Sequence, residues 1–134
     1  MNMPIRKTKI RRLGDLQLNI MKVLWARREA TVAEVQQDLE RGSELAYTTV
    51  ATMLRKMEVR GLVGHRLEGR TFIYSAHVAE GAVARSMADD LIDRVFEGSL
   101  ADMVSHLLTT RAVSRNELAR LERLIAEKKK MNSP

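Results

Sequence analysis

Three histidines are the side chains in this sequence best suited to metal binding or acid–base chemistry. His65, His77 and His106 stand 12 and 29 residues apart, and the chain contains no cysteine. Protein zinc sites usually combine His and Cys ligands in closely spaced pairs. A surface or boundary position is therefore the ordinary interpretation of these histidines, and the sequence predicts no metal site and no cofactor.

A short acidic run, Asp89, Asp90 and Asp93, is the other candidate for cation chemistry. Arg85 and Arg94 each lie four residues from one of these carboxylates, which favours a solvated, ion-paired helix face. The sequence also lacks a Gly-rich phosphate loop and a nucleophile elbow. We therefore expect no enzymatic activity, and a metal-dependent enzyme built on this acidic run is the weakest alternative.

A run of hydroxyl and basic side chains fits a different chemistry, the recognition of nucleic acid. At helical spacing, Val50, Leu54 and Met57 face inward and leave a polar face outside. Its hydroxyl and basic groups can contact base edges, thymine methyl groups and phosphates. The predicted DNA contacts on this segment are Tyr47, Thr48, Thr49, Thr52, Arg55 and Lys56. Helix capping is the alternative for Thr48, and packing in an interface is the alternative for Tyr47.

A basic hairpin follows this segment. Residues 62–67 and 71–75 alternate like two strands around a Gly-containing turn at 68–70. Arg66 and Arg70 flank the turn, a placement that brings cations to the phosphate backbone or a minor groove. A solvated basic turn is the alternative interpretation.

Three helices are expected to position these features. Asp15 is a suitable N-cap for a helix over 15–27, whose end Trp25 is expected to anchor. Thr31 and Glu34 predict a capping box for a second helix ending at Gly42, and the third helix covers 47–60 before Gly61. Three helices followed by a hairpin are the order of a winged helix-turn-helix. The predicted fold is therefore mainly α with a small β-hairpin wing.

Three more amphipathic helices are expected after the hairpin. Apolar residues recur at helical spacing over 79–98, and Ser99 and Ser114 are predicted to start the next two helices. A segment of this size is marginal as an independent domain, so its apolar stripes are expected to meet a second copy of the chain. Folding back onto the winged helix is the alternative. The predicted dimerisation residues are Val83, Met87, Leu91, Val95, Leu100, Val104, Leu107, Leu108, Leu118, Leu121 and Ile125.

Charge is distributed unevenly along the chain. Residues 1–77 hold 14 Lys and Arg against 8 Asp and Glu, whereas residues 78–134 hold 9 of each, so the net charge of +6 is N-terminal. This excess indicates a polyanionic partner, and duplex DNA, RNA and an anionic lipid surface are all compatible with charge alone. The sequence has no long apolar run and no secretory signal, so we expect a cytoplasmic chain without membrane insertion.

Four regions follow from these patterns. Residues 1–12 are predicted to form a flexible basic arm, whose Arg11 and Arg12 are further predicted DNA contacts. The winged helix-turn-helix is assigned to 13–77, the helical dimerisation domain to 78–127 and a basic tail to 128–134.

From about Leu13 to Ala126 the sequence resembles the BlaI/MecI-type penicillinase repressors, a family of bacterial winged-helix regulators. The motifs are Leu-Gly-Asp-Leu at 13–16, Met-Lys-Val-Leu-Trp at 21–25, Thr-Val-Ala-Glu-Val at 31–35, Ala-Tyr-Thr-Thr-Val at 46–50, Gly-Leu-Val at 61–63, Val-Phe-Glu-Gly-Ser at 95–99 and Ser-Arg-Asn-Glu-Leu at 114–118. The resemblance implies a homodimer that binds a palindromic operator and blocks transcription of resistance or stress genes. It implies DNA contacts by Thr48, Thr49, Thr52, Lys56, Arg66 and Arg70.

The resemblance also bears on regulation. In the best-known branch, a membrane sensor's signal leads to proteolysis at an Asn-Phe bond, and the similar position here is His106-Leu107. A protease of a sensor pathway is thus an implied partner, although the cleavage residues differ. Ala51 stands where some members have a basic residue, and the paired Cys-x-Cys motifs of the copper-responsive branch are absent. The main alternative function is a winged-helix protein-interaction module with only nonspecific affinity for DNA.

Overall fold

The computed structural model describes residues 13–39 and 44–133. The chain divides into two compact units, Met1–Asp90 and Leu91–Pro134. Residues 78–90, the first part of the predicted dimerisation region, thus belong to the first unit.

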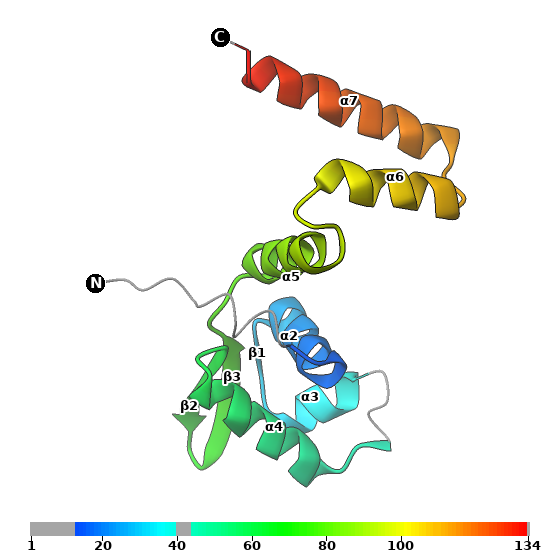
Figure 1. Ribbon diagram of the computed structural model, residues 1–134. Helices are drawn as coiled ribbons and strands as arrows, with labels where there is room; N and C mark the ends of the chain where they lie inside the picture. The colour runs from blue at the N-terminus through cyan, green and yellow to red at the C-terminus, as the bar shows by residue number, and fades with distance from the viewer. Residues whose placement is uncertain (1–12, 40–43, 134) are drawn as a thin grey trace. The chain divides into compact units, whose positions relative to one another are not determined.

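The first unit is a winged helix (Figure 1). In chain order its elements are α2 (Asp15–Arg27), β1 (Glu29–Ala30), α3 (Val32–Asp38), α4 (Tyr47–Val59), β2 (Val63–Glu68) and β3 (Thr71–Ala76), followed by the start of α5 (Glu80–Val95). The strands form one antiparallel sheet in the order β1-β3-β2, and the β2–β3 hairpin is the wing. The predicted fold class is confirmed.

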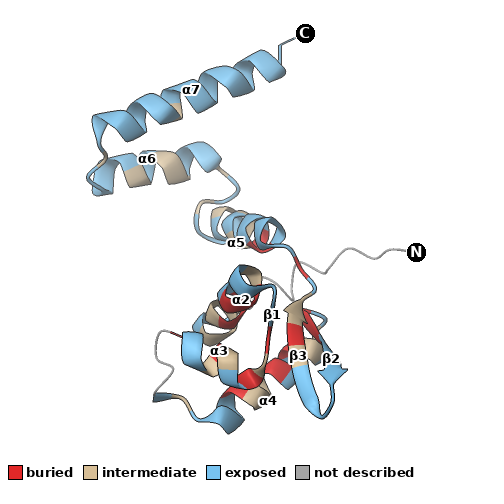
Figure 2. Ribbon diagram, turned by 180° about the vertical axis from the view of Figure 1, so that it is seen from behind, coloured by how far each residue is buried: buried red, intermediate tan, exposed pale blue. Residues whose placement is uncertain are grey.

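The core of this unit receives side chains from all three N-terminal helices and from the sheet (Figure 2). Val50, Leu54 and Met57 of α4 are fully buried in it, and Tyr74 of β3 joins them. Val83 from the start of α5 also belongs to this core. The predicted anchoring by Trp25 is confirmed, because its indole Nε1 donates to the carbonyl of Val78 at 2.9 Å.

The predicted helix over 15–27 is confirmed, but its predicted N-cap was wrong, and so was the predicted end of the second helix. The N-cap of α2 is Gly14, whose N–H donates to Gln17 Oε1 at 2.8 Å. Asp15 lies in the first turn instead, where its negative charge interacts favourably with the positive end of the helix dipole. Helix α3 ends at Asp38, because Leu39 turns to an extended backbone and is buried in the core. The expected stop at Gly42 lies outside the described residues.

Between α2 and α3, one local feature was predicted from the sequence and another was not. The Thr31–Glu34 capping box is confirmed: the Thr31 N–H donates to Glu34 Oε1 at 2.9 Å, and the Glu34 N–H donates to Thr31 Oγ1 at 3.1 Å. The short strand β1 was not predicted. It pairs with β3 through Glu29 and Ala30, which adds a third strand to the wing sheet.

The second unit contains the end of α5, α6 (Leu100–Thr110) and α7 (Arg115–Met131). The hydroxyls of Ser99 and Ser114 accept backbone N–H groups three residues on, so both predicted helix starts are confirmed. The Lys128–Lys130 run lies in the last turn of α7, where positive charges interact favourably with the negative end of the helix dipole. No residue of α6 or α7 is buried in the single chain. None of the described helices is long and apolar enough to cross a membrane.

Candidate nucleic-acid interface

Helix α4 has one buried and one exposed face, as its sequence period predicts. Val50, Leu54 and Met57 recur at spacings of four and three, and their burial fixes the rotation of the helix. The opposite side carries the predicted DNA-contacting side chains, which are exposed except for the half-buried Thr52: Tyr47, Thr48, Thr49, Thr52, Arg55 and Lys56. The sequence thus places these groups together on one surface.

The start of α4 bears on the alternatives considered for Thr48 and Tyr47. The N-cap residue is Ala46, and no side chain caps this helix, so Thr48 lies inside the first turn with its hydroxyl free of a capping role. Tyr47 is 53% exposed, which leaves its ring available to a partner. Further along, the Thr52 hydroxyl accepts from the Arg55 guanidinium at 3.2 Å, so these two side chains present a joined polar group.

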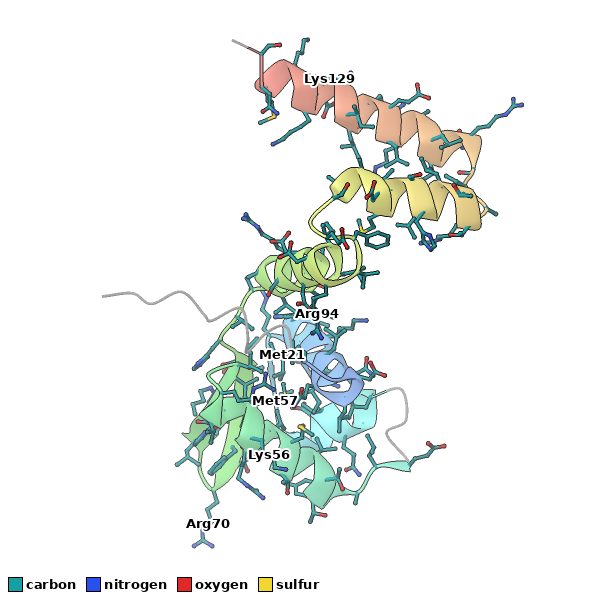
Figure 3. All side chains as sticks on the ribbon, viewed as in Figure 1. Met21, Lys56, Met57, Arg70, Arg94 and Lys129 are labelled. Carbon is teal, nitrogen blue, oxygen red and sulfur yellow. The ribbon has the colours of Figure 1, made fainter. Side chains whose placement is uncertain are left out.

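The wing places its two arginines in different environments. Gly69 has a φ of 63°, which suits glycine and closes a two-residue turn between Glu68 and Thr71. Arg70 lies at this turn, and Figure 3 shows its side chain extending away from the end of the hairpin. Arg66, by contrast, lies within β2 and is held by carboxylates.

The Arg66 guanidinium donates to both carboxylate oxygens of Glu29, at 2.7 and 3.3 Å, and to Glu68 at 3.0 Å. The hydrogen bond to Glu29 is the main cause of the raised pKa of Arg66, and the same bond lowers the pKa of Glu29. Arg66 thereby ties β2 to β1. Of the two predicted wing contacts, only Arg70 has no carboxylate partner among the described residues.

Another basic side chain near the helices is neutralised in the same way. Arg27 donates to Asp38 and to Glu34, and these bonds raise its pKa and lower that of Asp38. On α4 and at the wing turn, three exposed cations have no carboxylate partner in the described part of the chain and can meet an external anion: Arg55, Lys56 and Arg70.

Two features of this surface were not predicted from the sequence. Val59, in the last turn of α4, is 86% exposed and continues the spacing of Thr48, Thr52 and Arg55, which is the signal that marks it as part of the exposed face. The other is a hydrogen bond between Glu58 of α4 and His65 of β2, which joins the helix to the wing. Arg11 and Arg12, also predicted DNA contacts, lie outside the described residues.

The predicted dimerisation residues fall into two groups. Val83 is buried in the first unit and Met87 packs against the same core. In the second unit the side chains are exposed or half-buried (Figure 2). The exposed ones are Leu91, Val95, Leu100, Leu108, Leu118 and Ile125, and the half-buried ones are Val104, Leu107 and Leu121.

The predicted cleavage position lies inside α6. The Thr110 hydroxyl donates to the carbonyl of His106 at 2.8 Å, and the His106 ring lies 5.9 Å from the ring of Phe96. The His106–Leu107 peptide is therefore part of a regular helix.

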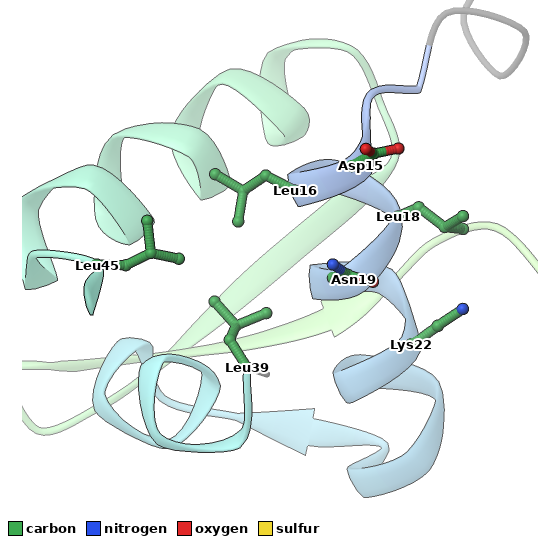
Figure 4. Close-up of a pocket in the computed structure, with 7 residues that line it drawn as sticks. All are labelled: Asp15, Leu16, Leu18, Asn19, Lys22, Leu39 and Leu45. Carbon is green, nitrogen blue, oxygen red and sulfur yellow. The ribbon is translucent and has the colours of Figure 1, made fainter. Parts of the chain in front are cut away.

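A hollow of about 420 Å³ lies between α4 and the wing, and the predicted DNA contacts Tyr47, Arg55 and Arg70 are among its lining residues. Another hollow, about 530 Å³, lies beside α2 and is lined by Asp15, Leu16, Leu18, Asn19, Lys22, Leu39 and Leu45 (Figure 4). Within 13–39 and 44–133, no group of three or more His, Asp or Glu side chains is arranged to hold a metal ion.

Comparison with known proteins identifies the family. Residues 13–127 match the family model described as penicillinase repressor. A penicillinase repressor of Bacillus licheniformis is 29% identical over 90% of this chain and 94% of its own length. The transcriptional regulator BlaI of Mycobacterium tuberculosis is 35% identical over 89% of this chain and 86% of its own. The solved structure of monomeric Bacillus licheniformis BlaI in complex with the blaP half-operator is 32% identical over 54% of this chain and 88% of that one, with a TM-score of 0.46. The chain therefore belongs to the penicillinase repressor family of DNA-binding transcriptional regulators.

Proposed function

We propose that this repressor binds a palindromic operator as a homodimer, with α4 of each copy in a major groove and the wing turn on the adjacent backbone. The single observation that carries the assignment of residues is the exposed face of α4. It gathers hydroxyl and basic side chains next to a wing arginine, while Arg27 and Arg66 are neutralised within the chain.

The chemistry of that face suits DNA. Lys56 and Arg55 can reach phosphate oxygens or guanine, and the threonine hydroxyls can reach base edges. Val59 supplies an apolar surface at the end of α4 that fits a thymine methyl group. Arg70, at the turn, contacts phosphate and positions the protein without reading sequence.

Pairing of two copies is supported by the apolar surface of the second unit. Leu100, Val95 and Ile125 are more than half exposed in the single chain, although side chains of this kind gain free energy when they leave water. Exposed apolar side chains gathered along helices are typical of an interface with another protein. Val83 is already buried in the first unit, so we place the start of the interface at Leu91.

A twofold dimer presents two recognition helices to half-sites about one helical turn apart, which explains why a palindrome is the expected operator. The regulated genes follow from the family and are proposed to be resistance or stress genes. A protease that cut between His106 and Leu107 would have to unwind α6 first, since that peptide is helical.

Replacement of Thr52 and Lys56 together by alanine tests the reading surface. Duplexes are selected from a random pool by the wild-type chain, and binding of both proteins to the selected and to scrambled duplexes is measured. The double variant is expected to lose the preference for the selected sequence. Lys22→Ala, which removes an exposed charge from α2, is the matched control and keeps the preference.

The rival function, a protein-interaction module, gives a different result. In that case the wild-type chain binds selected and scrambled duplexes with the same weak affinity. A double variant that keeps the full preference would place sequence reading on another surface.

A further inference from the structure

A side-chain hydrogen bond joins the recognition helix to the wing. Nδ1 of His65, on β2, donates to the Glu58 carboxylate of α4, and it lies 2.8 and 2.9 Å from the two carboxylate oxygens. A carboxylate only accepts hydrogen bonds, so the proton is on the imidazole nitrogen. The pair is about two-thirds buried on both sides, at 28% and 34% side-chain exposure.

The His65 ring is also fixed from within the hairpin. It stacks on Phe72 of β3 with the ring centres 4.1 Å apart and the planes within 6° of each other. It lies 5.7 Å from the ring of the buried Tyr74, its register partner across the hairpin. Cross-strand aromatic contacts of this kind stabilise a hairpin. The helix, the imidazole and the strand that leads back from Arg70 thus form a continuous set of contacts.

The next residue along β2 holds the other face of the same strand. Successive side chains of a strand point to opposite faces, so Arg66 points away from α4, toward Glu29 of β1. Consecutive residues therefore tie β2 to α4 on one face and to β1 on the other. Burial of Val63 and Tyr74 anchors the hairpin in the core, and the attachment to α4 is the side-chain link between the hairpin that carries Arg70 and the recognition helix.

We propose that Glu58 and His65 are positioning residues, which hold the wing so that Arg70 meets the DNA backbone while α4 lies in the groove. The inference rests on the proposed DNA-binding function. For Glu58→Ala it predicts a change in DNA affinity opposite to the change expected from charge alone. Removal of the Glu58 charge should favour a polyanion, but loss of the link should lower affinity for the operator.

The test combines Glu58→Ala with Arg70→Ala. On a duplex selected from a random pool by the wild-type chain, Arg70→Ala is expected to lower affinity about tenfold, the value of one charge-assisted contact. Glu58→Ala is also expected to lower the affinity for this duplex, by at most the same factor. In the Arg70→Ala background it should have almost no further effect, because it acts through Arg70. Glu44→Ala, which removes an exposed carboxylate just before α4, is the control and should not weaken binding.

Two outcomes overturn the proposal. One is stronger binding by Glu58→Ala, as charge alone dictates. The other is an equal loss in the wild-type and Arg70→Ala backgrounds, which would show that Glu58 acts independently of the wing arginine.

A measurement without DNA separates this inference from the proposed function. Hydrogen exchange of the amides in β2 and β3 should accelerate in Glu58→Ala but not in Glu44→Ala, because opening of the hairpin becomes easier. Unchanged exchange would contradict the link itself. Faster exchange in a chain that shows no preference for any duplex would leave the link intact and reject the DNA-binding function.

Discussion

Alanine replacement of each wing arginine separates a DNA contact from a structural tie. Arg66→Ala and Arg70→Ala each remove one positive charge from the same hairpin. Arg66, however, is already paired with Glu29 and Glu68, whereas Arg70 has no carboxylate partner among the described residues. The two variants are therefore expected to differ in how salt affects DNA binding.

The magnitude follows from counterion release. Each phosphate that a protein neutralises adds about 0.9 to the slope of log affinity against log salt concentration. Arg70→Ala should make the slope shallower by about 0.9 for one wing, and by about 1.8 for a dimer that uses both. Arg66→Ala should leave the slope unchanged, because its charge is neutralised within the chain.

The assay is fluorescence anisotropy of a labelled duplex, titrated with each variant at salt concentrations between about 50 and about 200 mM, the range over which phosphate contacts dominate. Thermal unfolding of each variant shows that the fold is retained. Equal reductions in slope for both variants would refute the assignment of the phosphate contact to Arg70 rather than Arg66. A reduction for Arg66→Ala alone would assign that contact to Arg66 instead.

Three further predictions concern assembly and stability. A chain truncated after Asp90 should sediment as a monomer, and a dimeric fragment would move the interface into the first unit. Leu54→Ala should lower the free energy of unfolding by about 2–5 kcal/mol because the side chain is fully buried, and Thr31→Ala should lower it by about 1 kcal/mol through loss of the α3 cap; denaturant titration measures both. The pKa values of Glu34, which accepts from the Thr31 backbone, and of Asp38, which pairs with Arg27, are lowered in the folded chain. Their stabilising effect is therefore present above about pH 4 and lost as pH falls, so the unfolding temperature of a Glu34→Gln, Asp38→Asn variant should depend less on acid than that of the wild type.

The sequence was sufficient to predict the features that depend only on residues close together in the chain. The spacing of Val50, Leu54 and Met57 determines which face of α4 is buried, and Ser99 and Ser114 mark helix starts through hydrogen bonds that reach only three residues along the chain. Such rules need no knowledge of tertiary contacts. The wing turn was predicted on the same basis, because it requires a glycine with positive φ.

Features that depend on distant residues were not predictable. Arg66 pairs with Glu29, which lies 37 residues earlier in the sequence. The local sequence around Arg66 therefore does not show that its charge is neutralised. Strand β1 is two residues long and shows no alternation. Val83 has the same helical spacing as the apolar residues after it, yet it is buried in the first unit, and only the fold distinguishes a core position from an exposed one.

The attachment of Arg66 to Glu29 has an evolutionary consequence. Glu29 accepts two of the three hydrogen bonds that hold this guanidinium. A single mutation there would leave Arg66 with Glu68 as its one carboxylate partner among the described residues, and so make more of its charge available at the wing without changing the exposed face of α4. Relatives could thus diverge in overall operator occupancy while they keep the same sequence preference, and an acidic or neutral residue at this position would distinguish weak from strong binders.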